Sequence, residues 1–152
     1  MPEQETLERA HEDKEEGKSA STQAGEFVRE EMHHIREGKH GAANTKQAIA
    51  IGLSKARRAG VDLPPPRSGK TSTRTRKQAE RDTEKGQTSR GARPSATRSR
   101  ATTNALKREG HSAASRTNLA QHARIAAKKR SSASRSKSAK AAAQTRKRTA
   151  GR

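Results

Sequence analysis

Two overlapping pairs of glutamate and histidine are the residues best suited to chemistry in this chain. Glu30 with His33, and Glu31 with His34, have the Glu-x-x-His spacing found in carboxylate-bridged di-iron bundles. Those sites draw their ligands from four helices, and the second helix expected here, residues 44–59, has neither His nor a carboxylate. We interpret the pairs as a solvated polar face and predict no metal site. Binding of a stray divalent ion, or pH sensing, stays open for His33 and His34.

A short glycine-containing segment matches a nucleotide site only in part. Gly69-Lys70-Thr71 has the ending of a phosphate-binding loop, but Pro64 stands where that loop needs its first glycine. No Ser/His/Asp set lies on a framework able to hold it. The chain contains no Cys, which excludes disulfides, zinc–thiolate sites and thiol catalysis. We predict that the protein is not an enzyme and uses no cofactor.

Charge is distributed very unevenly along the chain. Residues 1–40 contain 11 Asp/Glu and 6 Lys/Arg, whereas residues 41–152 contain 5 Asp/Glu and 29 Lys/Arg. Residues 86–152 hold 18 Lys/Arg and one carboxylate, that of Glu109. A segment this basic repels itself unless an anion neutralises it, and nucleic acid is the commonest polyanion. The charge distribution therefore predicts a nucleic-acid partner.

The composition of the basic segment indicates how it would bind. Arg outnumbers Lys, which favours forked contacts with phosphate, and the absence of aromatic residues argues against base stacking on single strands. We expect sequence-independent contacts with phosphates, with duplex DNA favoured over RNA. Arg90-Gly91-Ala92-Arg93-Pro94 approaches the core of an A·T hook, but Ala92 breaks its register. The predicted nucleic-acid-binding residues are Arg90, Arg93, Arg98, Arg100, Lys107, Arg108, Arg116, Arg124, Lys128, Lys129, Arg130, Arg135, Lys137, Lys140, Arg146, Lys147 and Arg148.

Apolar residues are scarce, at 26% of the chain with a single Phe. Low hydrophobicity combined with high net charge is the signature of disorder, so any core should be small and local. Glycines recur where helices would end, at Gly17, Gly38, Gly60, Gly86 and Gly110. The pattern predicts serial short helices, because strand-type alternation is absent from the sequence.

Two of these helices have an apolar stripe at helical spacing. The first covers residues 21–37, with Ser21 or Thr22 as the expected cap, and the second covers residues 44–59. Gly52 in the second helix would allow close approach of the first. We expect an αα-hairpin that presents an interface to a protein partner or to a second copy. The residues of that interface are Phe27, Val28, Met32, Ile35, Ile49 and Leu53.

The fold class predicted from these features is mostly α with extensive disorder. Residues 1–20 are expected to form an acidic arm that is weakly helical or disordered, and residues 21–63 the helical hairpin. Residues 64–95 read as a basic linker rich in Pro, Ser and Thr. Residues 96–152 form a tail rich in Ala, Arg, Lys and Ser, expected to be disordered when free and helical when bound.

The sequence contains one faint repeat. R-E-G-K-H-G-A-A-N, residues 36–44, is similar to R-E-G-H-S-A-A-S, residues 108–115, which is one residue shorter. We interpret both segments as a glycine that stops one helix, followed by the cap of the next.

Three segments carry a resemblance to known proteins. K-Q-A-I-A-I-G-L-S-K-A-R-R-A-G, residues 46–60, resembles the signature of an uncharacterised family of small basic bacterial proteins, variously labelled DNA-binding or plasmid-stabilisation proteins. Residues 24–39 and 105–115 are similar to longer members of that family. The resemblance implies a bacterial source and transfers no catalytic residue.

These observations together favour a histone-like, DNA-binding accessory protein that neutralises backbone phosphates. The alternatives are an RNA- or ribosome-associated basic protein, and a protein–protein adaptor that uses the hairpin. The N-terminus is acidic and lacks the apolar run of a signal peptide, and the longest apolar run, residues 48–51, is too short to span a membrane. We therefore expect a cytoplasmic, nucleoid-associated protein with no membrane partner and no small-molecule substrate.

Overall fold

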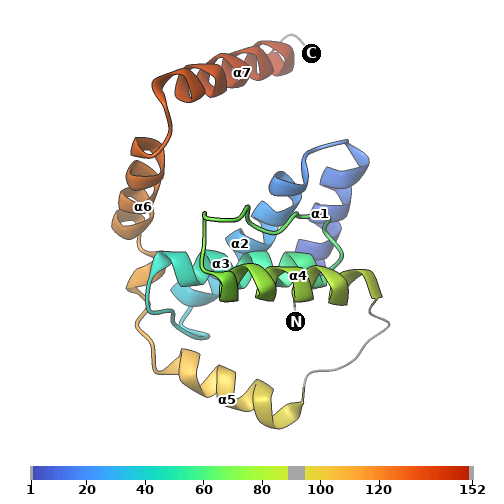
Figure 1. The fold of residues 1–152 in the computed structure, drawn as a ribbon, viewed down its shortest axis with the longest axis vertical. Coiled ribbons are helices and arrows are strands. Elements are labelled where there is room, and N and C mark those ends of the chain that lie inside the picture. The colour runs from blue at the N-terminus through green and yellow to red at the C-terminus, as the bar shows by residue number, and fades with distance from the viewer. Residues whose placement is uncertain (1, 89–94, 151–152) are drawn as a thin grey trace. The chain divides into compact units, whose positions relative to one another are not determined.

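Helices account for all the regular structure in the part of the chain that the structure describes. The computed structural model describes residues 2–88 and 95–150 (Figure 1). The chain divides into two compact units, Met1–Ser115 and Arg116–Arg152, which we describe separately. The elements are α1 Gln4–Glu15, α2 Ala20–Arg36, α3 Thr45–Arg58, α4 Thr73–Thr88, α5 Ala96–Lys107, the 3-10 helix η1 Ser112–Ala114, α6 Arg116–Lys128 and α7 Ser132–Ala150.

The prediction of extensive disorder is wrong. Helices α5, α6 and α7 occupy most of the predicted tail, residues 96–152, and α4 occupies much of the predicted linker, residues 64–95. Low hydrophobicity and high net charge argue against a large core, but they do not prevent helix formation. The hydrogen bonds of a helix are local, and Ala, Arg, Lys and Gln, which make up 13 of the 19 residues of α7, are among the best helix formers.

Helix α1 is a packed element and not a loose arm. Its apolar side packs on α2, where Leu7 and Ala10 join a core cluster with Ala24 and Phe27. Thr6 and Asp13 of α1 are also buried. The first residues of the chain therefore cover the apolar stripe of α2.

Helices α2 and α3 lie close to the positions that the apolar stripes predict, and they make the most extensive contact in the fold. Ser19, and not Ser21 or Thr22, caps α2, because its side chain accepts a hydrogen bond from the Thr22 amide. Gly52 confirms the expected close approach: a Cβ there would lie 2.7 Å from the Cα of Val28. The α3 backbone can touch α2 only because residue 52 has no side chain.

Helix α4 packs on α3 although Ala79 is its one apolar residue. Gly86, expected to end a helix, lies inside α4, where a Cβ would collide with the carbonyl oxygen of Arg57. Asp82 is 1% exposed and accepts hydrogen bonds from Ser54 Oγ at 2.6 Å and from Arg58 Nε at 2.7 Å. A glycine contact and a buried carboxylate thus replace the apolar stripe that a packed helix usually has.

The two segments of the faint repeat lie against each other. The Ala42 amide donates to the Gly110 carbonyl at 3.1 Å, and Arg36 Nε donates to the Ala114 carbonyl at 2.9 Å. Neighbouring residues add two bonds, from the Gly41 amide to the Leu106 carbonyl at 2.9 Å and from Thr45 Oγ1 to the Ala113 carbonyl at 2.7 Å. The similarity that we interpreted only as two helix stops also marks a contact between residues 36–44 and 108–115.

No helix within the described residues combines the length and apolar character required to cross a membrane.

Candidate functional site

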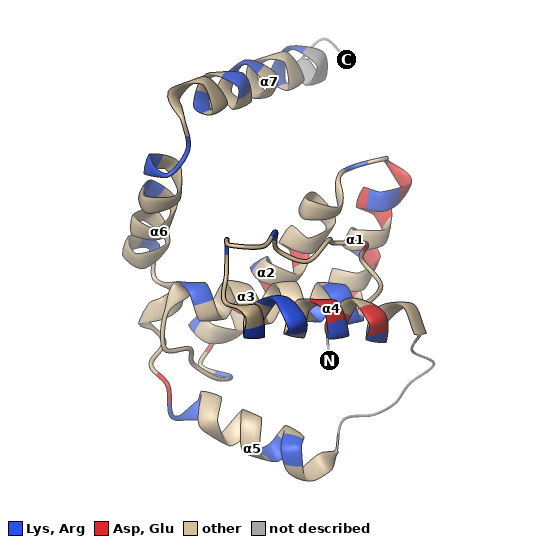
Figure 2. Ribbon diagram, viewed as in Figure 1, with Lys and Arg blue, Asp and Glu red and all other residues tan. Residues whose placement is uncertain are grey.

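The predicted phosphate-binding residues lie mainly on three helices with exposed surfaces. Neither α5 nor α6 buries any residue, and the described side chains of residues 131–147 are all exposed. No Asp or Glu follows Glu109 in the sequence, and Figure 2 shows Lys and Arg without acidic residues along α6 and α7. The positive charge of residues 116–152 therefore has no neutralising carboxylate within that unit.

The structure places the predicted residues as follows. Arg90 and Arg93 lie outside the described residues, and the side chain of Arg148, in α7, is not described. Exposed positions are occupied by Arg98, Arg100 and Lys107 on α5, Arg108 at its C-terminal cap, Arg116, Arg124 and Lys128 on α6, Lys129 and Arg130 between α6 and α7, and Arg135, Lys137, Lys140, Arg146 and Lys147 on α7.

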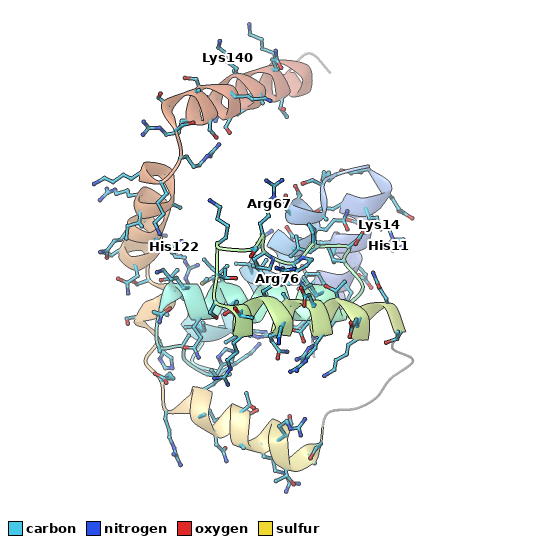
Figure 3. The ribbon with its side chains drawn as sticks, viewed as in Figure 1. His11, Lys14, Arg67, Arg76, His122 and Lys140 are labelled. Carbon is cyan, nitrogen blue, oxygen red and sulfur yellow. The ribbon has the colours of Figure 1, made fainter. Side chains whose placement is uncertain are left out.

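Basic residues occupy more than one face of α7. Lys137 and Lys140 are three residues apart and share a face, whereas Arg135 lies two residues before Lys137 and points to another side of the helix. Figure 3 shows the Lys140 side chain extending away from the helix. Arg130 is held locally, because its guanidinium donates to the Ser134 carbonyl at 3.1 Å and to the Ser138 hydroxyl. The remaining charge surrounds the helix and does not form a single stripe.

Several basic residues of the first unit serve the fold instead. Arg57 is 7% exposed and donates to the carbonyl oxygens of Leu63 at 3.2 Å and Pro64 at 3.3 Å. Its burial lowers the pKa of the guanidinium, partly offset by the nearby charge of Asp82. Arg58 is paired with Asp82 at 2.7 Å. These arginines stabilise the chain after α3 and the docking of α4, and the buried Arg57 is poorly placed to reach phosphates.

The predicted hairpin interface lies largely inside the first unit. Phe27, Met32 and Ile35 are buried, and Val28, Ile49 and Leu53 are partly buried. Leu53 packs against the cluster that α1 completes with Ala10. The side chains expected to meet a partner therefore contact other elements of their own chain.

The Glu-x-x-His pairs differ from the expected solvated face. Glu30 is 5% exposed and Glu31 is fully buried, so that interpretation is wrong for both carboxylates, while His33 is exposed as expected. Sequence reasoning missed His40 and Lys55, whose side chains approach Glu31. His40 follows α2 in a loop and Lys55 lies on α3, so only the tertiary fold brings them to this glutamate.

Residues 16–67 match DUF6496, a family of unknown function. The matched range includes α2, α3 and the chain immediately after them, and it contains two of the three segments that carry the expected resemblance, residues 24–39 and 46–60. No curated protein and no solved structure matches the chain. The comparisons thus agree with a resemblance to an uncharacterised family, and the labels of DNA binding and plasmid stabilisation stay predictions.

Proposed function

We propose that the protein binds duplex DNA without sequence preference, through Lys and Arg side chains on α5, α6 and α7. The observation that carries the proposal is the unit formed by residues 116–152, which has 12 Lys/Arg, no Asp/Glu and no buried side chain among those described. Residues 1–115 hold the other 23 Lys/Arg together with all 16 Asp/Glu. In a cell, such a protein would be associated with the nucleoid.

Duplex DNA is favoured over RNA by the shape of the basic elements. The major groove of B-form DNA admits an α-helix, and a helix with basic residues on several faces can reach phosphates on both strands. The major groove of A-form RNA is deep and narrow, which restricts such contacts. The unit also lacks the aromatic residues that stack on single-stranded bases. Because these contacts are to phosphates, we expect little preference for any base sequence.

The test compares the full chain with a chain that ends at Ser115, the boundary of the first compact unit. Each protein is titrated into labelled duplex DNA, duplex RNA and single strands, and binding is followed by fluorescence anisotropy at several salt concentrations. If about 8–12 phosphates are contacted, log K against log salt should have a slope of about −7 to −11 for the full chain. The shorter chain should bind far more weakly and with a shallower slope.

A charge variant separates electrostatics from truncation. Replacing the exposed Lys/Arg of α6 and α7 with Gln keeps helix propensity while removing charge, and exchanging Lys for Arg at the same positions keeps charge. The Gln variant should show a much shallower salt slope, and the exchange variant should keep the slope of the wild type. Tighter binding to duplex RNA would favour the RNA-associated alternative, and absence of binding at low salt would overturn the proposal.

A further inference from the structure

Glu31, in the middle of α2, is a fully buried carboxylate with unusual surroundings. His40 Nε2 lies 3.3 Å from its Oε1, and Lys55 Nζ lies 2.7 Å from its Oε2. Lys55 therefore pairs with Oε2, whereas Oε1 faces His40 Nε2 and accepts no hydrogen bond from the residues that the structure describes. A buried carboxylate oxygen without a donor is costly, so a further ligand is expected at Oε1.

The histidine next to this carboxylate is oriented by its other ring nitrogen. His40 Nδ1 lies 3.1 Å from the carbonyl oxygen of Gly41. A carbonyl can only accept, so Nδ1 carries the proton, and in the neutral ring Nε2 has a lone pair. The 3.3 Å between Nε2 and Oε1 matches one edge of a tetrahedral metal site, which is about 3.3–3.4 Å when the bonds are about 2.0–2.1 Å.

A second histidine, His34, completes the set and is oriented in the same manner. Its Nε2 lies 2.8 Å from Glu3 Oε1, and its Nδ1 lies 3.9 Å from Glu30 Oε1, beyond hydrogen-bonding distance. The same Glu3 oxygen also accepts a hydrogen bond from Lys39 Nζ at 3.1 Å. A carboxylate that accepts from one histidine nitrogen and leaves the other free is the usual outer partner of a metal-bound histidine.

We propose that Glu31, His34 and His40 bind one divalent transition-metal ion of the zinc class. One ligand atom from each residue lies within 4.8 Å of the others, so modest side-chain movement closes the set around an ion. One carboxylate oxygen and two imidazole nitrogens suit Zn²⁺ and its neighbours better than Ca²⁺ or Mg²⁺. Lys55 remains on Oε2, and water fills the fourth position. The ion would tie the loop after α2 to α2 itself.

A proton is the rival occupant of the same place. If His40 is an imidazolium, it neutralises Glu31 without a metal. The two cases differ in their response to pH, because metal ligation needs neutral histidines and releases protons, whereas an imidazolium contact needs the proton.

The test uses the full chain without DNA and with Zn²⁺ or Co²⁺ as the probe. Zn²⁺ affinity is measured by competition with a chromophoric chelator, and Co²⁺ is followed by its visible absorption spectrum. The wild-type chain should bind one ion, with a Co²⁺ spectrum typical of a low-coordinate nitrogen–oxygen site. Glu31→Gln and His40→Gln should each weaken binding at least tenfold.

The matched control is His33→Ala, which removes an exposed histidine one residue from His34, paired with Glu37 at 3.1 Å. It should leave affinity and stoichiometry unchanged. Circular dichroism in the presence of a chelator shows whether each variant folds. If Glu31→Gln does not fold, His40→Gln, which changes a loop residue, still tests the site. The proposal is overturned if the wild type binds no ion, or if His33→Ala weakens binding as much as His40→Gln does.

Discussion

The two compact units use the same kinds of residue in opposite ways. Residues 1–115 hold charges of both signs and bury several of them, including Glu31 and Asp82. Residues 116–152 hold charge of one sign, and Ile125 is the exposed large apolar residue among those described. The first unit pairs many of its charges internally, whereas the second has basic residues and no Asp or Glu to pair with them.

The difference teaches how a chain poor in apolar residues can still pack. In the first unit, glycines at positions 41, 52 and 86 let backbones touch, and carboxylates such as Asp82 collect donors from neighbouring helices. Residues 116–150 contain neither Gly nor Asp/Glu, and the described side chains among them are exposed or partly buried. Helix propensity and local hydrogen bonds, such as those of Arg130, therefore carry more of the stability of α6 and α7.

The contact at Gly52 offers the largest expected effect. Gly52→Ala places a Cβ 2.7 Å from the Val28 Cα, and because that atom belongs to the backbone it cannot move aside cheaply. We expect the free energy of unfolding of the first unit to fall by about 3 kcal/mol. Gly25→Ala is the matched control, since nothing lies within 4 Å of a Cβ there, and it should stabilise α2 by about 0.5–1 kcal/mol. Urea denaturation followed by far-UV circular dichroism measures both. If the Gly52→Ala chain were as stable as wild type, close contact between the α2 and α3 backbones would not be what requires glycine at position 52.

Asp82 tests the polar half of the packing. Asp82→Ala leaves Ser54 Oγ and Arg58 Nε without their acceptor, and we expect a loss of about 2 kcal/mol in the free energy of unfolding. Glu84→Ala changes an exposed carboxylate on the same helix and should stay within about 0.5 kcal/mol of wild type. Equal effects of the two substitutions would mean that α4 is held by something other than Asp82.

Helices α2 and α3 could be predicted because their apolar side chains repeat at helical spacing and their ends have caps and glycines. Asn44 caps α3 through the Gln47 amide, and Gly38 and Gly60 have positive φ angles of 74° and 92°. Val61, the residue after Gly60, is buried. Caps, helix-ending glycines and apolar periodicity depend on residues that are close in the sequence, so they can be recognised without the tertiary structure.

The packing of α4 and the ligand set around Glu31 could not be predicted in that way. Ala79 alone gives α4 no apolar stripe. The sequence also does not distinguish a glycine that ends a helix from one, such as Gly86, that lets a helix contact the Arg57 backbone. Glu31 looks like a solvent-facing helix residue until His40 and Lys55 are brought to it from a loop and another helix. Contacts between polar atoms, and the close backbone contacts that glycine allows, leave no periodic apolar pattern in the sequence.

The docking of α1 gives a smaller effect that depends on pH. Hydrogen bonds from His34 and Lys39 lower the pKa of Glu3 from 4.5 to about 2, so ionised Glu3 favours the folded state. That contribution is fully present above the ordinary pKa of 4.5, and it disappears as pH falls from there through about 2. Glu3→Gln should therefore be less stable than wild type at neutral pH and equal to it at the acid end. Glu12→Gln, at an exposed position of α1, is the matched control. Chemical denaturation at a series of pH values measures the gap, and a gap that does not change with pH would contradict the role of Glu3.

The smallest expected effect concerns the boundary between the units. A chain that ends at Ser115 should unfold with a free energy within about 0.5 kcal/mol of the first unit in the full chain, because α6 buries no residue and the compact units divide at this point. The separate segment of residues 116–152 should lose its helix content gradually on heating, since single helices lack the cooperativity that tertiary packing provides. Circular dichroism of the two pieces and of the full chain makes the comparison, and the melting curves of the pieces should add up to that of the whole. If the shorter chain lost its sharp transition, the basic helices α6 and α7 would also stabilise the first unit. The first unit would then not fold independently of the residues assigned to DNA binding.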